Sequence, residues 1–293
     1  MPASIKLPNE VDERAGEYKL RRILLAHDNS YAAQQAFKDA EALALRFHAE
    51  IILVRVVVPN EEYSGRALSS KREEDSAELE SLVESLSAKG ISSRTIVRAG
   101  LVGDTLFHIA HQEKADLLLL GAYGLGSQDR QTLGSTAEHL LRAIPCPVLT
   151  FGPHATSGLL QRLEGVSSLL VAVPLPFQSD WLQPAVQIAQ LFGKEIELVH
   201  VTQTSRQRVE ESKSREQCEA LAVWVREQGV AANWTIFSGV PSIFVHACAE
   251  ERKSAVIVLP LQRRDRLSSI TSDNVAAQII RQAKIPVLSY RID

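Results

Sequence analysis

The chain has 293 residues, of which 45% are hydrophobic and 23% are charged, as is typical of a soluble globular protein. Its net charge of -3 offers no basic excess for binding nucleic acid. No apolar run approaches the roughly 20 residues that cross a bilayer. Residues 1–18 are polar and lack the apolar core of an export signal, so we expect them to be an N-terminal arm. We therefore expect a cytoplasmic protein with neither a nucleic-acid nor a membrane partner.

The expected elements of residues 19–152 are short apolar runs that alternate with amphipathic segments. Strands are expected at 22–26, 50–58, 93–97, in the apolar run after Asp116, and at 145–151. Helices are expected at 31–47, 71–89 and 104–113, with a fourth that opens at Gly134, whereas 60–70 is expected to be a loop. Strands that alternate with helices predict a parallel sheet with helices on both faces.

The segment after this first domain has the Gly, Pro and Ser content of a linker, which we place at 153–165. The same order of elements then repeats over a second domain, 166–293. Its strands are expected at 168–173, 195–201, 233–237, 255–259 and 286–290, and its helices at 180–192, 206–227, 242–250 and 273–283. Pro147, Val148 and Leu149 each recur 139 residues later, as Pro286, Val287 and Leu288. We interpret the chain as a tandem duplication.

A glycine pattern follows the apolar strand of the first domain. Gly121 and Gly124 stand at the C-terminal end of that strand, nine residues separate Gly124 from Gly134, and Gly134-Ser135 opens a helical segment. Backbone N–H groups and the helix dipole favour an anion at that point, so the pattern predicts a phosphate-binding loop. It is neither a Walker loop, which needs Gly-Lys-Ser or Gly-Lys-Thr, nor the Gly-x-Gly-x-x-Gly dinucleotide fingerprint.

The pattern resembles that of ATP-binding members of the universal stress protein family, which carry Gly, two residues, Gly, nine residues, Gly, then Ser or Thr. Gly121, Gly124, Gly134 and Ser135 match it in register, and the strand after Pro147 is similar to the family's last strand. The resemblance covers nearly the whole chain as two fused copies. It implies two tandem Rossmann-like domains of the adenine nucleotide alpha hydrolase-like type, each an α/β domain with a five-stranded parallel sheet flanked by helices.

The resemblance also implies a ligand, ATP, whose phosphates Mg²⁺ can accompany. Asp28 and the backbone at Val56 would hold adenine, and the ribose would lie against Gly121. The donors to the phosphates would be Gly124, Gly134, Ser135 and Thr136. Taken alone, Asp28 fits a helix N-cap better, and Gly134-Ser135 fits an ordinary helix start. Arg130 lies in the same loop and could reach phosphate, although a loop arginine is more often solvated.

The second copy lacks this pattern. Gly121 corresponds to Pro260, Gly124 to Arg263, Gly134 to Asp273, Ser135 to Asn274, and Asp28 to Pro174. Proline offers no N–H, and the Asp273 carboxylate would repel phosphate, so we expect ATP to bind in the N-terminal domain only. Domains of the family pair through their last strands. The resemblance therefore implies an internal pseudo-dimer in which 148–150 pairs with 287–289, and two chains can associate further as a homodimer.

Signals of catalysis are sparse. His108 and His111 have no further ligand at metal spacing, and Ser135 has no sign of an activating base. Three scattered cysteines fit neither a zinc site nor a disulfide framework: Cys146, Cys218 and Cys248. We expect no catalytic residue and no metal site.

The function that the resemblance implies is regulatory, in stress survival, with slow ATP hydrolysis at most. One alternative is an ATP-consuming enzyme of the same fold group, which would need a general base and a substrate pocket. The other is an interaction scaffold that does not depend on nucleotide.

Overall fold

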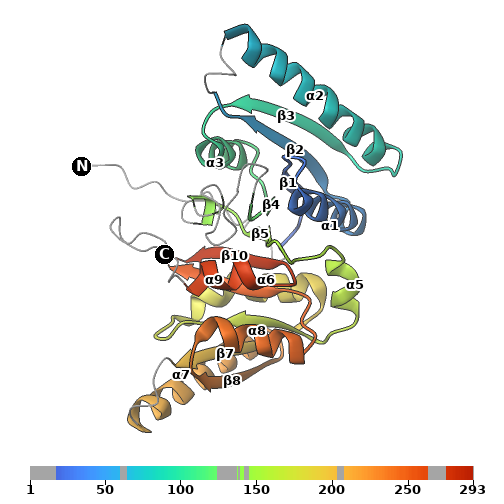
Figure 1. Cartoon of the computed structure of the whole chain (residues 1–293). Helices are drawn as coiled ribbons and strands as arrows, with labels where there is room; N and C mark the ends of the chain where they lie inside the picture. Colours follow the sequence, from blue (N-terminus) through green and yellow to red (C-terminus); the bar gives the residue numbers. More distant parts are fainter. Residues whose placement is uncertain are drawn as a thin grey trace, which may run out of the picture.

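The computed structural model of this chain describes residues 18–59, 65–123, 137, 139–141, 145–202, 208–262 and 275–292. Within these residues the strands form a ten-stranded sheet in the order β3-β2-β1-β4-β5-β10-β9-β6-β7-β8 (Figure 1). The first five are β1 (Arg22–Ala26), β2 (Glu50–Val57), β3 (Ser93–Ala99), β4 (Leu117–Gly121) and β5 (Val148–Phe151). The others are β6 (Ser168–Ala172), β7 (Glu195–Thr202), β8 (Ala232–Ser238), β9 (Ile257–Gln262) and β10 (Val287–Ile292).

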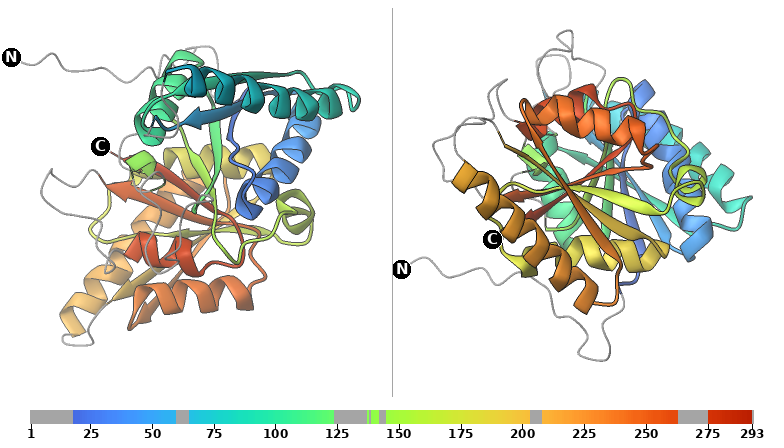
Figure 2. Two further views of the ribbon diagram at one scale, coloured as in Figure 1. Left: turned by 45° about the horizontal axis from the view of Figure 1, so that its top comes forward. Right: turned by 90° about the horizontal axis from the view of Figure 1, so that it is seen from below.

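Strands within each half of the sheet are parallel, and helices cover both of its faces (Figure 2). The helices are α1 (Tyr31–Phe47), α2 (Gly65–Ser87), α3 (Val102–Gln112), α5 (Leu159–Glu164), the 3₁₀ helix η1 (Ser179–Leu182), α6 (Gln183–Phe192), α7 (Arg208–Glu227), α8 (Pro241–Glu251) and α9 (Val275–Gln282). The predicted α/β class, with two five-stranded parallel sets of strands, is therefore confirmed.

Two segments are more helical than the sequence suggested. Helix α2 begins at Gly65 rather than at residue 71, because Arg66, Ala67 and Leu68 are good helix formers that outweigh the neighbouring glycine and serines. Gly90 adopts the left-handed conformation (φ 76°) just beyond the end of α2, as expected of a C-terminal glycine.

The segment expected as a linker carries helix α5. The N–H groups of Gly158 and Leu159 at its start donate to Asp39 Oδ1, at 2.6 and 3.1 Å, and the N–H of Ser157 donates to Gln35 Oε1 at 3.0 Å. Asp39 and Gln35 both lie on α1, so these bonds fix the connecting segment to the first half of the molecule.

The hydrophobic core forms two layers, one on each face of the sheet. Successive residues of a strand point to opposite faces, so Ile23 and Leu25 enter one layer and Leu24 enters the other. The first layer packs under α1, α2, α6 and α7, and the second under α3, α8 and α9. Each layer runs through both halves, which makes the ten strands one continuous scaffold.

The two halves meet where β5 pairs antiparallel with β10, at the middle of the molecule in Figure 1. Leu149 faces its own counterpart Leu288, and the residues on either side exchange partners, which is the pattern of a twofold contact. Phe47 and Phe192, at the ends of α1 and α6, also meet edge to face, with ring centroids 5.6 Å apart. The segments 148–150 and 287–289 thus lie opposite each other.

Candidate functional site

The candidate site lies at the C-terminal ends of β2, β1 and β4. Strands β2 and β3 lie on one side of β1, and β4 and β5 lie on the other, so the strand order reverses between β1 and β4. Ligands of open parallel sheets bind at such a switch point, beyond the carboxyl ends of the strands. Because Ala26 pairs with Val54 and Leu25 with Leu119, the register places Val56 level with Asp28, and Gly121 within one residue of that level, at this edge.

Asp28 lies in the turn between β1 and α1. Its Oδ1 accepts a hydrogen bond from the N–H of Ser30 at 3.0 Å, while the Ser30 hydroxyl caps α1 by accepting from the N–H of Ala33 at 3.2 Å. The N-cap role considered for Asp28 is therefore wrong, because Ser30 fills it. Asn29 between them is left-handed (φ 65°), a conformation that asparagine tolerates better than most residues. Asp28 thus sits half-buried in a fixed turn.

The other two described site residues owe part of their identity to packing. The Val56 side chain is half-buried in the layer beneath α3, so the role implied for Val56 falls to its backbone, which lies in the ladder opposite Arg98. A Cβ at Gly121 would lie 2.8 Å from the Cβ of Ala32, which shows that β4 approaches α1 too closely for a side chain. Five of the predicted loop residues lie outside the described part of the chain: Gly124, Arg130, Gly134, Ser135 and Thr136.

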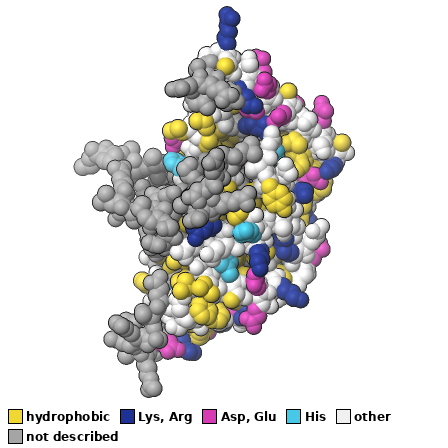
Figure 3. All heavy atoms as spheres, viewed as in Figure 1, with side chains coloured by type: hydrophobic (Ala, Val, Ile, Leu, Met, Phe, Trp, Pro, Cys, Tyr) yellow, Lys and Arg dark blue, Asp and Glu magenta, His cyan; other side chains and the backbone are white. Residues whose placement is uncertain are grey.

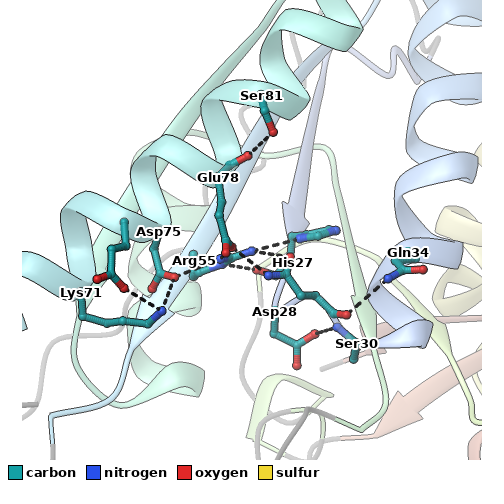
Figure 4. Close-up of polar contacts among 11 residues, drawn as sticks. His27, Asp28, Ser30, Gln34, Arg55, Lys71, Asp75, Glu78 and Ser81 are labelled. Atoms are coloured by element: carbon teal, nitrogen blue, oxygen red, sulfur yellow. Dashed lines mark hydrogen bonds and ion pairs between the residues drawn. The ribbon is translucent and has the colours of Figure 1, made fainter. Parts of the chain in front are cut away.

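A buried arginine that the sequence did not single out stands at the centre of the site. Arg55, on β2, has a side chain that is only 8% exposed. Its Nε donates to the carbonyl oxygen of His27 at 3.0 Å, and one terminal nitrogen donates to Asn29 Oδ1 at 2.7 Å. The other terminal nitrogen contacts Asp75 Oδ1, at 3.0 Å, and Glu78 Oε2. Figure 4 shows the guanidinium group lying between helix α2 and the β1–α1 turn.

A second cation, Lys71, lies 3.2 Å from Asp75, so this buried carboxylate contacts two cations. Hydrogen bonds from Arg55 and then from Asn29 lower the pKa of the Glu78 carboxyl below its ordinary value. Burial and then the charge of Arg55 lower the pKa of His27, which keeps that imidazole neutral beside the guanidinium.

The second half differs at the matching positions. Strand β9 continues through Pro260 to Gln262, paired with β10, whereas β4 ends at Gly121. The place of the glycine turn is therefore taken by regular strand. Pro174 follows β6 at the position of Asp28, and Arg263, Asp273 and Asn274 lie outside the described residues.

His200 on β7 is the counterpart of Arg55, and Val173 is that of His27, because both strand pairs align from their first residues. The ring of His200 is buried, and its Nδ1 donates to the carbonyl oxygen of Val173 at 2.9 Å. Both halves thus use a side chain of the second strand to hold the carbonyl after the first strand. Burial lowers the pKa of His200 below its ordinary value of 6.5.

This shift predicts a pH-dependent stability. The pKa of His200 is lower in the folded chain than in the unfolded chain, where it has its ordinary value of 6.5, so the neutral ring stabilises the fold fully above pH 6.5. As the pH falls below 6.5, the unfolded chain takes up a proton first, and the free energy of unfolding decreases by up to about 1.4 kcal/mol per pH unit. His200→Asn keeps a donor near the Nδ1 position but does not titrate. Between pH 7.5 and 5.5, the free energy of unfolding measured in urea should fall less for the variant than for the wild-type chain. An equal fall would show that His200 does not cause the pH dependence.

In the described part of the molecule, no group of three or more His, Cys, Asp or Glu side chains could hold a metal ion, and none of the helices combines the length and apolar character of a membrane span. Cys146, Cys218 and Cys248 are free and buried, and burial raises the pKa of the first to about 12 and of the second to about 11. On the face in Figure 3, charges of both signs are interspersed.

The topology and the site define a doubly wound α/β protein with its candidate ligand site at the switch point. Residues 19–151 match the model of the universal stress protein family. A universal stress protein of Thermus aquaticus is 31% identical over 133 residues, which are 44% of this chain and 96% of the relative. One of Methanocaldococcus jannaschii is 29% identical over 143 residues, 46% of this chain and 84% of the relative. This chain belongs to the universal stress protein family.

The likeness of fold extends beyond the matched domain. The crystal structure of a universal stress protein from Archaeoglobus fulgidus superposes with a TM-score of 0.71. The superposition covers 94% of this chain and 97% of the Archaeoglobus fulgidus chain, and the two are 17% identical in sequence. Both halves of the sheet therefore have a counterpart in that structure.

Proposed function

We propose that this chain is a cytoplasmic, regulatory universal stress protein that binds one ATP in its N-terminal half. The observation that carries the proposal is the convergence of Asp28, Val56 and Gly121 at the switch point, within one residue of the same level. The same half carries the glycine pattern that resembles the family's ATP loop. Asp28 would accept from the adenosine end, and the loop N–H groups would face the phosphates with any accompanying Mg²⁺. Occupancy would change the surface offered to partners under stress.

The restriction to one half rests on the difference between β4 and β9. Pro260 lies inside a paired strand where the first half ends its strand at Gly121, so the second half has no turn at this position for a ligand to approach. Pro174 replaces the carboxylate of Asp28. We assign the second half a structural role, as the other member of an internal pseudo-dimer that arose by tandem duplication. We expect two such chains to be able to associate as a homodimer.

The test is calorimetric titration of the intact chain with ATP, ADP and AMP. We expect about one ATP per chain and binding weakened at least tenfold in Asp28→Ala and Gly134→Asp. Asp28→Asn serves as a fold control, because its amide oxygen can still accept from the N–H of Ser30. His200→Asn, in the second half, should leave the stoichiometry at one.

Three outcomes would each overturn the proposal. Two equivalents of ATP would contradict the structural role of the second half. No binding by the wild-type chain would favour a scaffold that does not depend on nucleotide. Sustained turnover with a second substrate, well above slow background hydrolysis, would favour an ATP-consuming enzyme.

A further inference from the structure

Arg55 contacts both residues that flank Asp28. It holds the carbonyl oxygen of His27 on one side and the side chain of Asn29 on the other. Asn29 is in the left-handed region, so the turn is defined by a backbone conformation that needs support from outside. The turn that carries the Asp28 carboxylate is therefore held in part by a guanidinium group that does not belong to the turn.

The same guanidinium group is anchored on helix α2. The Asp75 carboxylate is 5% exposed and lies at 3.0 Å from Arg55, and the Glu78 carboxylate makes the second contact. Glu78 also accepts from the Asn29 amide at 2.8 Å, so α2 touches the turn directly as well. Figure 4 shows this chain of contacts from Lys71 on α2 to the turn that carries Asp28. One connected network thus links the helix to the candidate nucleotide site.

We infer that Arg55 is a positioning residue for the adenosine end of the site, and that Glu78 couples the attachment of α2 to nucleotide occupancy. The inference rests on the proposed function of this half. Binding that favours one arrangement of the turn must stabilise the contacts that hold it, and those contacts must in turn favour binding. Bound ATP should therefore strengthen the attachment of α2 to the turn, and weakening that attachment should weaken the binding of ATP.

Glu78 is the member of the network that can change most readily. Its side chain is 53% exposed, so releasing it returns a carboxylate to water instead of leaving a buried charge unpaired. Asp75 has no such freedom because it is buried. In the second half, His200 makes the bond to the Val173 carbonyl with an imidazole, a group with too few donors to bridge to two carboxylates as well. His200 therefore cannot make the bridge to a helix that Arg55 makes in the half that carries the ATP pattern.

The experiment compares two substitutions on the same helix, Glu78→Ala and Glu74→Ala. Glu74 is exposed, lies one turn before Glu78 and pairs with Lys71 at 3.6 Å. Calorimetry measures the dissociation constant for ATP, and hydrogen exchange of residues 65–87 is followed with and without ATP. We expect Glu78→Ala to weaken ATP binding three- to tenfold and Glu74→Ala to change it less than twofold. Glu78→Gln, which keeps an acceptor, should recover part of the loss.

Hydrogen exchange separates positioning from a loss of general stability. In the wild-type chain ATP should slow the exchange of α2, and in Glu78→Ala this slowing should disappear although ATP still binds at saturating concentration. Two results would overturn this inference and leave the proposed function standing, provided that the wild-type chain binds ATP. One is an equal dissociation constant for ATP in the two alanine variants. The other is hydrogen exchange in α2 that ATP does not change. Failure of the wild-type chain to bind ATP would instead overturn the proposed function, and this inference with it.

Discussion

Replacing Arg55 by methionine should lower the free energy of unfolding by about 3–5 kcal/mol, the usual cost of removing one partner from a buried ion pair. The Arg55 side chain is 8% exposed and that of its partner Asp75 is 5% exposed, so the substitution leaves a carboxylate in the core with Lys71 as its remaining cation at 3.2 Å. The carbonyl of His27 loses its donor as well. Urea unfolding at pH 7.5, followed by circular dichroism, measures the loss.

Two further variants separate burial from charge in this prediction. Arg94→Met removes an arginine that also contacts two carboxylates, Glu50 and Glu113, but is 41% exposed, and it should cost less than about 1 kcal/mol. The double variant Arg55→Met, Asp75→Leu should recover most of the loss, because no uncompensated charge stays in the core. A loss for Arg55→Met no larger than that for Arg94→Met would show that the network contributes little to stability.

Much of the fold follows from local pattern. Apolar runs such as 22–26 and 117–121 are too short for helices and too apolar for loops, and the segments between them have helical spacing. Alternation of the two then restricts the topology to parallel strands with helices on both faces. The convergence of Asp28, Val56 and Gly121 follows from the same rule, because all three lie at or just beyond the C-terminal ends of parallel strands. This part of the candidate site could be predicted without coordinates.

The network around Arg55 could be predicted only in part. Within β2, Ile51, Leu53 and Arg55 share one face, and this period of two indicates that the arginine lies in the core. On α2, Asp75 precedes the buried Leu79 by four residues and so belongs to the inner stripe. These signals show that a cation and an anion are buried. That they meet, and that the cation also holds His27 and Asn29, depends on how α2 crosses the sheet, which no local pattern encodes.

Gly121 shows a different limit. A glycine at the end of a strand is needed equally where a ligand approaches the backbone and where another element does. The 2.8 Å approach of the missing Cβ to Ala32 reveals the second reason, which depends on the distance between β4 and α1. The spacing from Gly121 to Gly124 and Gly134 indicates the first reason, the approach of a ligand. Both reasons apply to Gly121, but only the spacing can be seen in the sequence.

Replacing Gly152 by alanine should destabilise the junction of the two halves. Gly152 follows β5, and a Cβ there would come closer than 3.0 Å to the carbonyl oxygen of Ile280, near the end of α9 in the second half. That atom is backbone, so relief requires a shift of α9 against β5 instead of a rotamer change. We expect Gly152→Ala to cost about 1–3 kcal/mol or more. Urea unfolding at pH 7.5 measures this loss.

Gly165→Ala is the matched control, because Gly165 has φ -84° and the nearest atom to its added Cβ would be the carbonyl oxygen of Arg162 at 3.6 Å. Alanine fits that position without strain and restricts the unfolded chain, so it should be neutral or stabilise by up to about 1 kcal/mol. The two variants add the same methyl group on either side of the connecting segment. Equal stabilities would mean that the contact between β5 and α9 can yield at little cost, and that the halves are not packed as rigidly as the continuous sheet implies.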